Sequence, residues 1–390
     1  MEGPAPMTAA ARAEDFPDLL YSDAERALAG SLRSLLADRC AAGAVLARTE
    51  SAQTYDDALW QAVAADLGLA GLLIPERDGG AGAGYREAAA AAEALGAFVA
   101  PVPYLGSAVV ATAALLAAGS PAHPAAARLL PELAAGGATA ALAVPAATAP
   151  RSGFPGSVRL SGPRPGDAAA GTSRLRGEVR GVADALPAGL LLVPADGVPQ
   201  ALYLVEAAAG GVAKAPVTSL DMTRQLCDLS FDDAPGTLLA SGDAAARAVQ
   251  AALAAEQVGL AERCLEMTVA YLKQRRQFAR PVGSFQALKH RLADVWVEVA
   301  QARAASRYAA ACLASGHRDA PVAVALAKAY CSQAAVHAAQ ECVQLHGGIG
   351  FTWEHPAHLY LKRAKADSIA FGTPDAHRAA LASLVDLPAP

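Results

Sequence analysis

The order of hydrophobic patterns along the chain is the feature that most constrains its fold. Helical spacing fills the first third, short β-type runs fill the middle, and long helical segments follow Ser241. These four long segments span about 243–276, 284–315, 321–346 and 356–371, and each closes on Gly, Pro or a polar turn. Long antiparallel helices with short connections are typical of a four-helix bundle. The order predicts an α+β fold that is mostly helical.

The middle region, 137–240, changes from helical spacing to short apolar or alternating runs. Examples are "TAALAVPAA", "GLLLVPA" and "QALYLVEAA", which are separated by Gly, Pro and Asp at close intervals. Such spacing favours an antiparallel barrel or sandwich. We therefore expect a flexible tail at 1–18, a helical domain at 19–136, the β domain at 137–240 and the bundle at 241–390.

One acidic residue falls on the apolar stripe of the first bundle segment. The stripe repeats at three and four residues, as expected of a helix with one buried face, through Val249, Leu253, Leu260, Cys264, Met267 and Tyr271. Glu256 lies on it, four residues before Leu260. A carboxylate there would be partly desolvated, which predicts a raised pKa. Two interpretations stay open, a general base and a buried acid paired with an arginine.

Composition narrows the class of protein. A chain of 390 residues that is 54% hydrophobic can bury a large core. Its formal charge is -5 and it has no basic run, so we expect no nucleic-acid partner. Residues 97–127 lack charged side chains, but the helical part "SAVVATAALLAAG" is shorter than the roughly 20 residues that span a bilayer. We expect a buried core helix and no membrane segment.

Cysteine and histidine spacing gives no sign of a metal site. None of the six cysteines forms a C-x-x-C pair, which is typical of buried reduced thiols in a cytoplasmic protein. His346, His355 and His358 lie close in sequence, but Pro356 prevents the i, i+4 helical pair that zinc sites use. We expect no bound metal.

Three segments resemble the acyl-CoA dehydrogenases. They are "LGLAGLLIPERDGGAG" at 67–82, "QRRQFARPVGSFQALKHRLADV" at 274–295 and "CVQLHGGIGFTWEHPAHLYLKRAKADSIAFGTP" at 342–374, so the likeness runs from about residue 20 to 385. The resemblance implies N-terminal helices, a middle β domain and a C-terminal four-helix bundle. It also implies FAD-dependent α,β-desaturation of an acyl-CoA thioester to a trans-2-enoyl-CoA, with a carboxylate taking the α-proton.

The resemblance assigns two groups of residues to the FAD of a neighbouring subunit. The R-x-x-F motif and the glutamine after it correspond to Arg275, Phe278 and Gln286. The loop around the adenosine end corresponds to Gln344, Gly347 and Gly348. A guanidinium can bind a pyrophosphate, and glycines allow close approach of backbone to a ligand. FAD is therefore expected at a subunit interface.

Two expected features are absent from the sequence. The loop "LAVPAATAPRSG" at 142–153 has no acid where the family holds the flavin of its own subunit. In "SIAFGTPDAHR", Phe371 replaces the glutamate that is the base in most members, while Gly372 and Thr373 still fit a turn that faces flavin or thioester. The family's second base position, near 246–250, also lacks a carboxylate.

The chain resembles the small subunits of heteromeric actinobacterial acyl-CoA dehydrogenases that lack the catalytic glutamate, whose substrates include steroid side-chain thioesters. This implies a partner subunit that carries the glutamate, with electron-transfer flavoprotein as an electron acceptor. Two alternatives stay open. The chain is a structural or regulatory subunit without a redox role, or it is a homo-oligomeric flavoenzyme with a relocated base such as Glu256.

Overall fold

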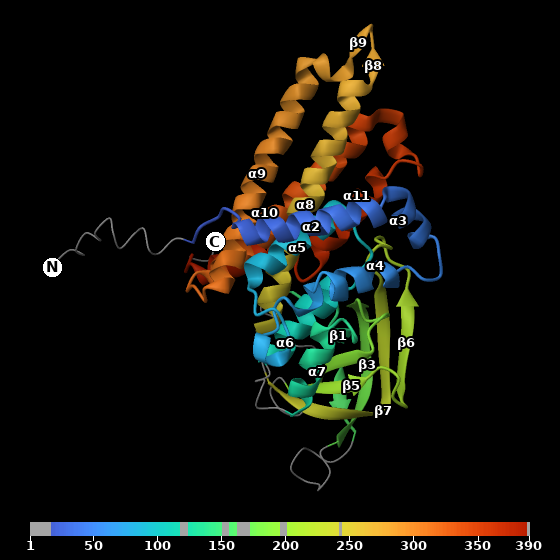
Figure 1. The fold of residues 1–390 in the computed structure, drawn as a ribbon, viewed down its shortest axis with the longest axis vertical. Coiled ribbons are helices and arrows are strands. Elements are labelled where there is room, and N and C mark those ends of the chain that lie inside the picture. The colour runs from blue at the N-terminus through green and yellow to red at the C-terminus, as the bar shows by residue number, and fades with distance from the viewer. Residues whose placement is uncertain are drawn as a thin grey trace, which may run out of the picture.

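The computed structural model describes residues 17–117, 124–149, 156–161, 172–195, 201–241 and 244–387. Almost all of the expected tail at 1–18, and the end of the 142–153 loop, lie outside these ranges. Helices occupy one side of the molecule and a curled sheet occupies the other (Figure 1). The mostly helical α+β prediction is confirmed, whereas the exact domain boundaries stay predictions.

The N-terminal part is helical, as predicted. Its α-helices are α2 (Asp23–Arg39), α3 (Ala42–Thr49), α4 (Asp57–Gln61), α5 (Tyr85–Ala97), α6 (Thr112–Ala117) and α7 (Pro124–Ala134). Short 3-10 or π-helical turns lie at Ala62–Asp66, Leu69–Gly71, Glu76–Asp78 and Tyr104–Ala111. The uncharged segment for which a membrane helix was considered forms the π-helical turn Tyr104–Ala111 and α6. The side chains from Tyr104 to Leu115 are buried. None of the helices in the described ranges has the length and apolar character needed to cross a membrane.

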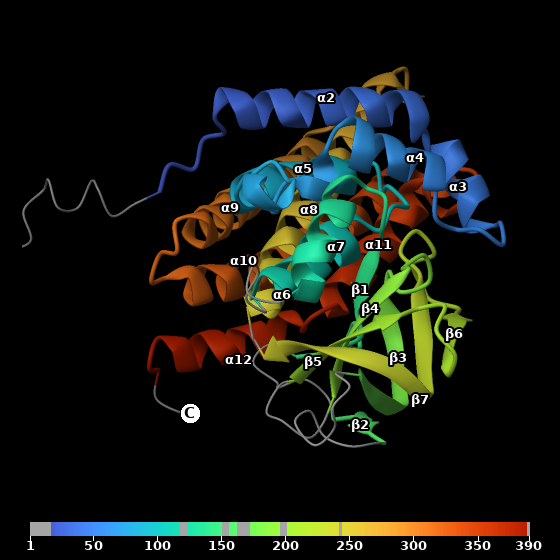
Figure 2. The same cartoon turned by 60° about the horizontal axis from the view of Figure 1, so that its bottom comes forward.

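The middle part forms one seven-stranded sheet within the described residues. Its strands are β1 (Ala140–Leu142), β2 (Val158–Leu160), β3 (Thr172–Ala183), β4 (Leu190–Ala195), β5 (Ala201–Glu206), β6 (Val212–Val217) and β7 (Leu226–Ser241). β1 pairs parallel with β4, and the other pairs are antiparallel. One end of the long β7 pairs with β6 and the other with β5, so the sheet curls around β7 (Figure 2).

The C-terminal part contains the predicted long helices. They are α8 (Ala244–Gln274), α9 (Gln286–Ala314), α10 (Ala320–His346) and α11 (Ala357–Ile369). Between α8 and α9 lie the two-residue strands β8 (Arg276–Gln277) and β9 (Arg280–Pro281), which form the protruding tip in Figure 1. Short 3-10 turns occur at Val282–Ser284 and Gly347–Phe351. The sequence analysis did not predict α12 (Pro374–Leu384).

Two glycines bring the N-terminal helices against the bundle. A Cβ on Gly259 of α8 would lie 1.8 Å from the carbonyl oxygen of Glu93 on α5, and one on Gly96 would lie 2.1 Å from that of Glu256. Since only glycine leaves room for such contact, α5 and α8 pack directly on each other. This packing places the buried carboxylate of Glu256 where the three parts of the chain meet.

Candidate functional site

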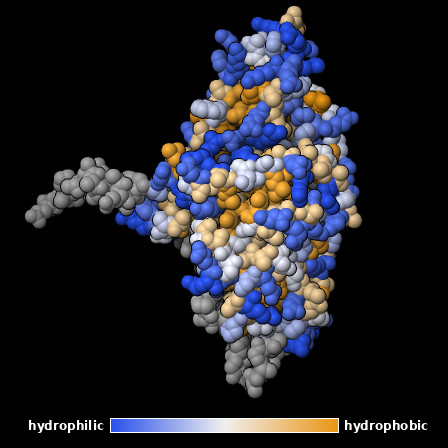
Figure 3. All heavy atoms as spheres, in the orientation of Figure 1, coloured by the Kyte–Doolittle hydropathy of each residue, from blue (hydrophilic) through white to orange (hydrophobic). Residues whose placement is uncertain are grey.

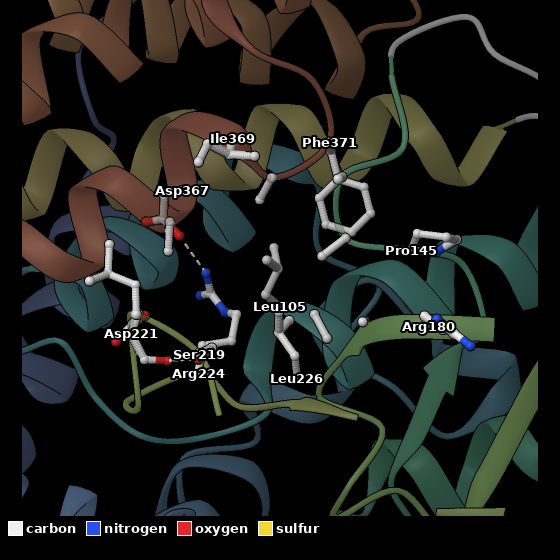
Figure 4. Close-up of a pocket in the computed structure, with 17 residues that line it drawn as sticks. Leu105, Pro145, Arg180, Ser219, Asp221, Arg224, Leu226, Asp367, Ile369 and Phe371 are labelled. Atoms are coloured by element: carbon white, nitrogen blue, oxygen red, sulfur yellow. Dashed lines mark hydrogen bonds and ion pairs between the residues drawn. The ribbon is translucent and has the colours of Figure 1, made fainter. Parts of the chain in front are cut away.

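A cavity of about 280 Å³ lies where the helical domain, the sheet and the C-terminal helices meet. Its walls come from the turn before α6, the loop after β1, strand β3, the loop before β7, and the end of α11 (Figure 4). The apolar wall includes Leu105, Pro145, Leu220, Leu226, Ile369 and Phe371. Because segments distant in sequence build it, the cavity depends on the assembled fold.

Phe371 forms part of this apolar wall. Its backbone has φ +52°, a left-handed conformation that is rare for a bulky residue. Its N–H donates a 2.6 Å hydrogen bond to the carbonyl oxygen of Ala146 in the loop after β1. The ring points into the cavity in Figure 4 and also lines a small pocket beside Asp184. The turn thus presents an apolar ring to the cavity.

A polar wall lies across the cavity from Phe371 (Figure 4). Arg224 donates from Nη1 to Oδ1 of Asp367 and from Nη2 to Oε2 of Glu256, both at 2.6 Å. Arg363 also donates to Glu256, and its Nε lies 2.5 Å from Oδ2 of Asp221. Two arginines therefore neutralise a buried group of carboxylates.

The expectation of a raised pKa at Glu256 is wrong. Burial alone would raise the pKa, but the charges of Arg224 and Arg363 and their hydrogen bonds lower it below its usual range. Each carboxylate oxygen of Glu256 accepts from one of these arginines. The geometry corresponds to the second interpretation, a buried acid paired with arginine, and does not favour Glu256 as a proton acceptor.

Asp367 is the titrating carboxyl in this cluster, and sequence analysis missed it. Burial and the neighbouring Glu256 raise the pKa of Asp367 to about 7, although Arg224 opposes the shift. Its Oδ2 has no hydrogen-bond partner among the described residues, and the residue lines the cavity. A sequence signal existed, because Asp367 precedes the turn at Phe371 by only four residues and lies in the last turn of α11.

A second pocket, of about 310 Å³, opens beside the tip of α8 and the end of α10. It brings together four of the residues that the resemblance assigns to FAD, namely Arg275, Gln344, Gly347 and Gly348. Arg291 also lines it and forms a two-point ion pair with Glu341, at 2.6 and 2.8 Å. Nothing lies within 4 Å of a Cβ built on Gly347 or Gly348, so the pocket is open at this loop.

Comparison with known proteins identifies the family. The models for the acyl-CoA dehydrogenase N-terminal and C-terminal domains match residues 22–137 and 247–385. The "Acyl-CoA dehydrogenase IpdE2" of Mycobacterium tuberculosis is 37% identical over 88% of this chain and 92% of its own. The chain belongs to the acyl-CoA dehydrogenase family. Its reaction class is therefore that of an oxidoreductase acting on CH–CH bonds.

Other relatives agree with this assignment. The "Acyl-CoA dehydrogenase IpdE2" of Mycolicibacterium smegmatis is 35% identical over 90% of this chain and 96% of its own. A chain from the crystal structure of the ChsE4-ChsE5 complex from Mycobacterium tuberculosis has a TM-score of 0.82 and 28% identity, covering 95% of this chain and 100% of its own. Butyryl-CoA dehydrogenase from Megasphaera elsdenii, at 22% identity and TM-score 0.83, covers 94% of this chain and 99% of its own and shows the shared fold.

Acyl-CoA dehydrogenases bind FAD, and the residues of the second pocket fit its phosphate end. Arg275 is exposed and supplies a guanidinium, and the open glycine loop leaves room for a ribose or phosphate. The fit is poorer at the first cavity. There the ring of Phe371 forms part of the cavity wall, and the carbonyl oxygen of Ala146 already accepts a hydrogen bond from the N–H of Phe371.

The remaining predicted FAD residues of this acyl-CoA dehydrogenase lie outside the pocket lining. Phe278 is 86% exposed at the tip, and its ring lies edge-on to that of Phe285, with the two centroids 6.3 Å apart. Gln286 is exposed at the first position of α9. Thr373 accepts a hydrogen bond from the N–H of Ala376 and so caps α12. The FAD roles of these three residues stay predictions.

The cysteines and histidines of this acyl-CoA dehydrogenase are also placed. All six cysteines are buried and free, which confirms the prediction of unpaired thiols. His346 stacks on Tyr271 at 4.6 Å and lies 4.2 Å from the ring of His355. In the described part of the chain, no three metal-binding side chains are grouped as a metal site.

Proposed function

We propose that this acyl-CoA dehydrogenase is the base-less subunit of a heteromeric enzyme that converts an acyl-CoA thioester to a trans-2-enoyl-CoA. The observation that carries the proposal is the apolar ring of Phe371 in the wall of the cavity, at the turn where a base is expected. A phenyl ring cannot accept a proton. The carboxylate that takes the α-proton would then belong to a partner subunit.

The second pocket supports a shared cofactor site. Arg275, Gln344, Gly347 and Gly348 are exposed, and exposed apolar side chains lie beside them in the chain, namely Phe278, Ile349 and Phe351. Figure 3 shows apolar surface just below the tip. Exposed apolar patches often mark protein interfaces. A subunit bound here would bring its FAD against Arg275 and the Gly347–Gly348 loop.

The chain's own residues would bind and orient in this arrangement. The guanidinium of Arg275 would neutralise a phosphate, and the 344–348 loop would exclude water from the adenosine end. FAD supplies the hydride acceptor of the reaction when bound. Electron-transfer flavoprotein is the proposed acceptor of electrons from the enzyme.

The names of relatives suggest a substrate class. Among related structures, one is titled as a steroid acyl-CoA dehydrogenase, Tcur3481-Tcur3483, with TM-score 0.81 and 28% identity over 93% of this chain and 98% of its own. The ChsE4-ChsE5 structure is titled as a complex. We propose that this chain likewise has a partner subunit and that its substrate is a steroid-derived acyl-CoA thioester.

The test is to purify the chain alone and together with a glutamate-bearing homologue from the same genome. We expect little flavin absorbance and no dye reduction by acyl-CoA thioesters from the chain alone. The co-purified pair should show both. Full flavin occupancy and turnover from the chain alone would overturn the proposal, and a pair without turnover would favour a structural or regulatory role.

A homo-oligomeric enzyme with its own base is the second candidate function. Asp367 favours it, because this carboxyl lines the cavity and its pKa is raised to about 7. A base is most effective when its pKa lies near the working pH. If the chain alone turns over substrate, Asp367→Asn should abolish turnover with flavin content unchanged.

A further inference from the structure

The turn that carries Phe371 is held in a conformation that the residue does not favour. Phe371 has φ +52° and Gly372 has φ +105°. A glycine adopts such angles freely, whereas a phenylalanine is strained there. Strained residues persist only where the surrounding structure over-determines them, so the contacts of this turn identify what fixes it.

Lys328 supplies the main contacts. It lies on α10, is completely buried, and its Nζ donates to the backbone carbonyl oxygens of Asp367 at 2.9 Å and Gly372 at 3.2 Å. A third bond, of 3.0 Å, goes to Oγ of Ser332. Asp367 and Gly372 lie on either side of Phe371 in the chain. One ammonium group therefore ties together the two ends of the strained segment.

His377 binds the backbone carbonyl of Phe371, which lies between Asp367 and Gly372 in the chain. Its Nε2 lies 2.9 Å from the carbonyl oxygen of Phe371. Burial lowers the pKa of His377 to about 4, so the ring is neutral and donates from Nε2. Thr373 caps α12 and starts the helix that carries His377. Together with the hydrogen bond from Phe371 to Ala146, the contact with His377 fixes both the N–H and the C=O of Phe371.

Charged and polar groups reach Lys328 from each neighbouring element. Burial lowers the pKa of Lys328 to about 8, and the carboxylate of Asp367 on α11 opposes this shift. Positive Lys328 in turn helps to lower the pKa of His377 on α12. From α8, Gln257 is hydrogen bonded to Ser332 and carries no charge. The ammonium depends on the turn carbonyls because, among the described residues, no carboxylate forms an ion pair with it.

We propose that Lys328 is a positioning residue, which holds the 367–372 turn so that the side chain at position 371 enters the cavity. The role does not depend on the identity of that side chain, because the oxygens of the turn that Lys328 binds are backbone carbonyls. It follows that the turn keeps its geometry in a chain whose base is replaced by phenylalanine. The inference does not rest on the heteromer proposal, since every contact lies within one chain.

Protonation of Lys328 should control the turn. Opening the turn would let water reach Lys328, whose pKa burial lowers to about 8 in the closed structure. A solvated lysine titrates at about 10.4, so the opened turn binds a proton more tightly than the closed turn. The closed turn should therefore become more stable as the pH rises from about 8 to about 10.

The test is hydrogen exchange of the peptide 366–378, followed by mass spectrometry in the full chain. We compare wild type with Lys328→Met, which keeps the aliphatic stem, and with Lys365→Met, an exposed lysine on α11. Exchange rates are normalised to peptides of α9 to remove the intrinsic effect of pH. At pH 7 we expect about tenfold faster exchange of the turn in Lys328→Met, the size of effect that loss of a charged hydrogen bond gives.

The pH series separates positioning from general stability. Wild type and Lys365→Met should gain turn protection between about pH 8 and about pH 10, whereas Lys328→Met should show no such change. Ser332→Ala removes one acceptor of Lys328 and so lowers the pKa of the enclosed ammonium further, and the gain of protection should then begin at lower pH than in wild type. Ser332→Ala serves as the test variant if Lys328→Met fails to fold. Equal turn exchange in Lys328→Met and Lys365→Met, or an unshifted profile in Ser332→Ala, would overturn the proposal.

Discussion

The backbone N–H of Phe371 donates a 2.6 Å hydrogen bond to the carbonyl oxygen of Ala146. This bond joins the turn after α11 to the loop after β1, and both segments line the cavity. Because the turn is fixed in this way, the side chain at position 371 decides whether the turn itself offers a proton acceptor to the cavity. The first prediction concerns this side chain.

Replacing Phe371 by Glu should not make the chain active alone. The new carboxylate would face the cavity, but under the proposed function the chain alone does not form a complete flavin site. Burying a carboxylate among apolar groups should lower the free energy of unfolding by about 1–3 kcal/mol. Flavin absorbance and dye reduction of the purified variant test the first point, and urea unfolding tests the second. Phe371→Leu, which keeps the wall apolar, is the control, and turnover by Phe371→Glu alone would contradict the prediction.

Replacing Glu256 by Gln should destabilise the protein. The change leaves the guanidinium groups of Arg224 and Arg363 without their shared carboxylate, and breaking a buried ion pair in this way costs about 3–5 kcal/mol. The free energy of unfolding from urea titration measures the loss.

The control for Glu256 is Glu266→Gln, because Glu266 is half-exposed and pairs with Arg263 one helical turn away. Such a surface pair contributes about 0–1 kcal/mol. If Glu256→Gln instead leaves stability unchanged but abolishes turnover of the assembled enzyme, Glu256 is catalytic and our interpretation of its ion pairs is wrong.

Replacing Arg275 by Gln should reduce flavin binding by the assembled enzyme. Loss of a charge-assisted bond to a phosphate costs about 1.5–3 kcal/mol, which corresponds to a tenfold or greater rise in the dissociation constant of the flavin. Flavin content after gel filtration measures it. Arg276→Gln is the matched control, since Arg276 is an exposed neighbour outside the pocket lining. Equal flavin content in the two variants would count against a cofactor role for Arg275.

The raised pKa of Asp367 predicts a pH dependence of stability. The folded pKa is about 7, whereas an aspartate in the unfolded chain titrates near about 4. Between these values the folded protein binds more protons than the unfolded chain, so its stability falls as the pH rises from about 4 to 7. Asp367→Asn should remove this contribution, as measured by urea unfolding at several pH values. Asp375→Asn, at an exposed site on α12, should keep it, and an unchanged slope in Asp367→Asn would refute the assignment.

Local sequence signals accounted for much of the fold because helix and strand periods depend on near neighbours. The stripe on α8 and the change of spacing after residue 137 both predicted the right class of element. The missed helix α12 also had a local signal, Thr373 as N-cap followed by Pro374 at the first helical position. The helix was missed because the turn was interpreted only as a possible site.

The amino-acid sequence by itself determined the family, the order of helices and strands, and the absence of a glutamate at position 371. Only the tertiary structure decided how the buried charges pair. Glu256 meets Arg224, 32 residues away, and Arg363, 107 residues away, and these contacts lower a pKa that burial alone would raise. Asp367, which shares Arg224 with Glu256, has the opposite shift, because burial and the charge of Glu256 outweigh the arginines. Desolvation and Coulomb energy depend on neighbours in space, and helical spacing does not specify those neighbours.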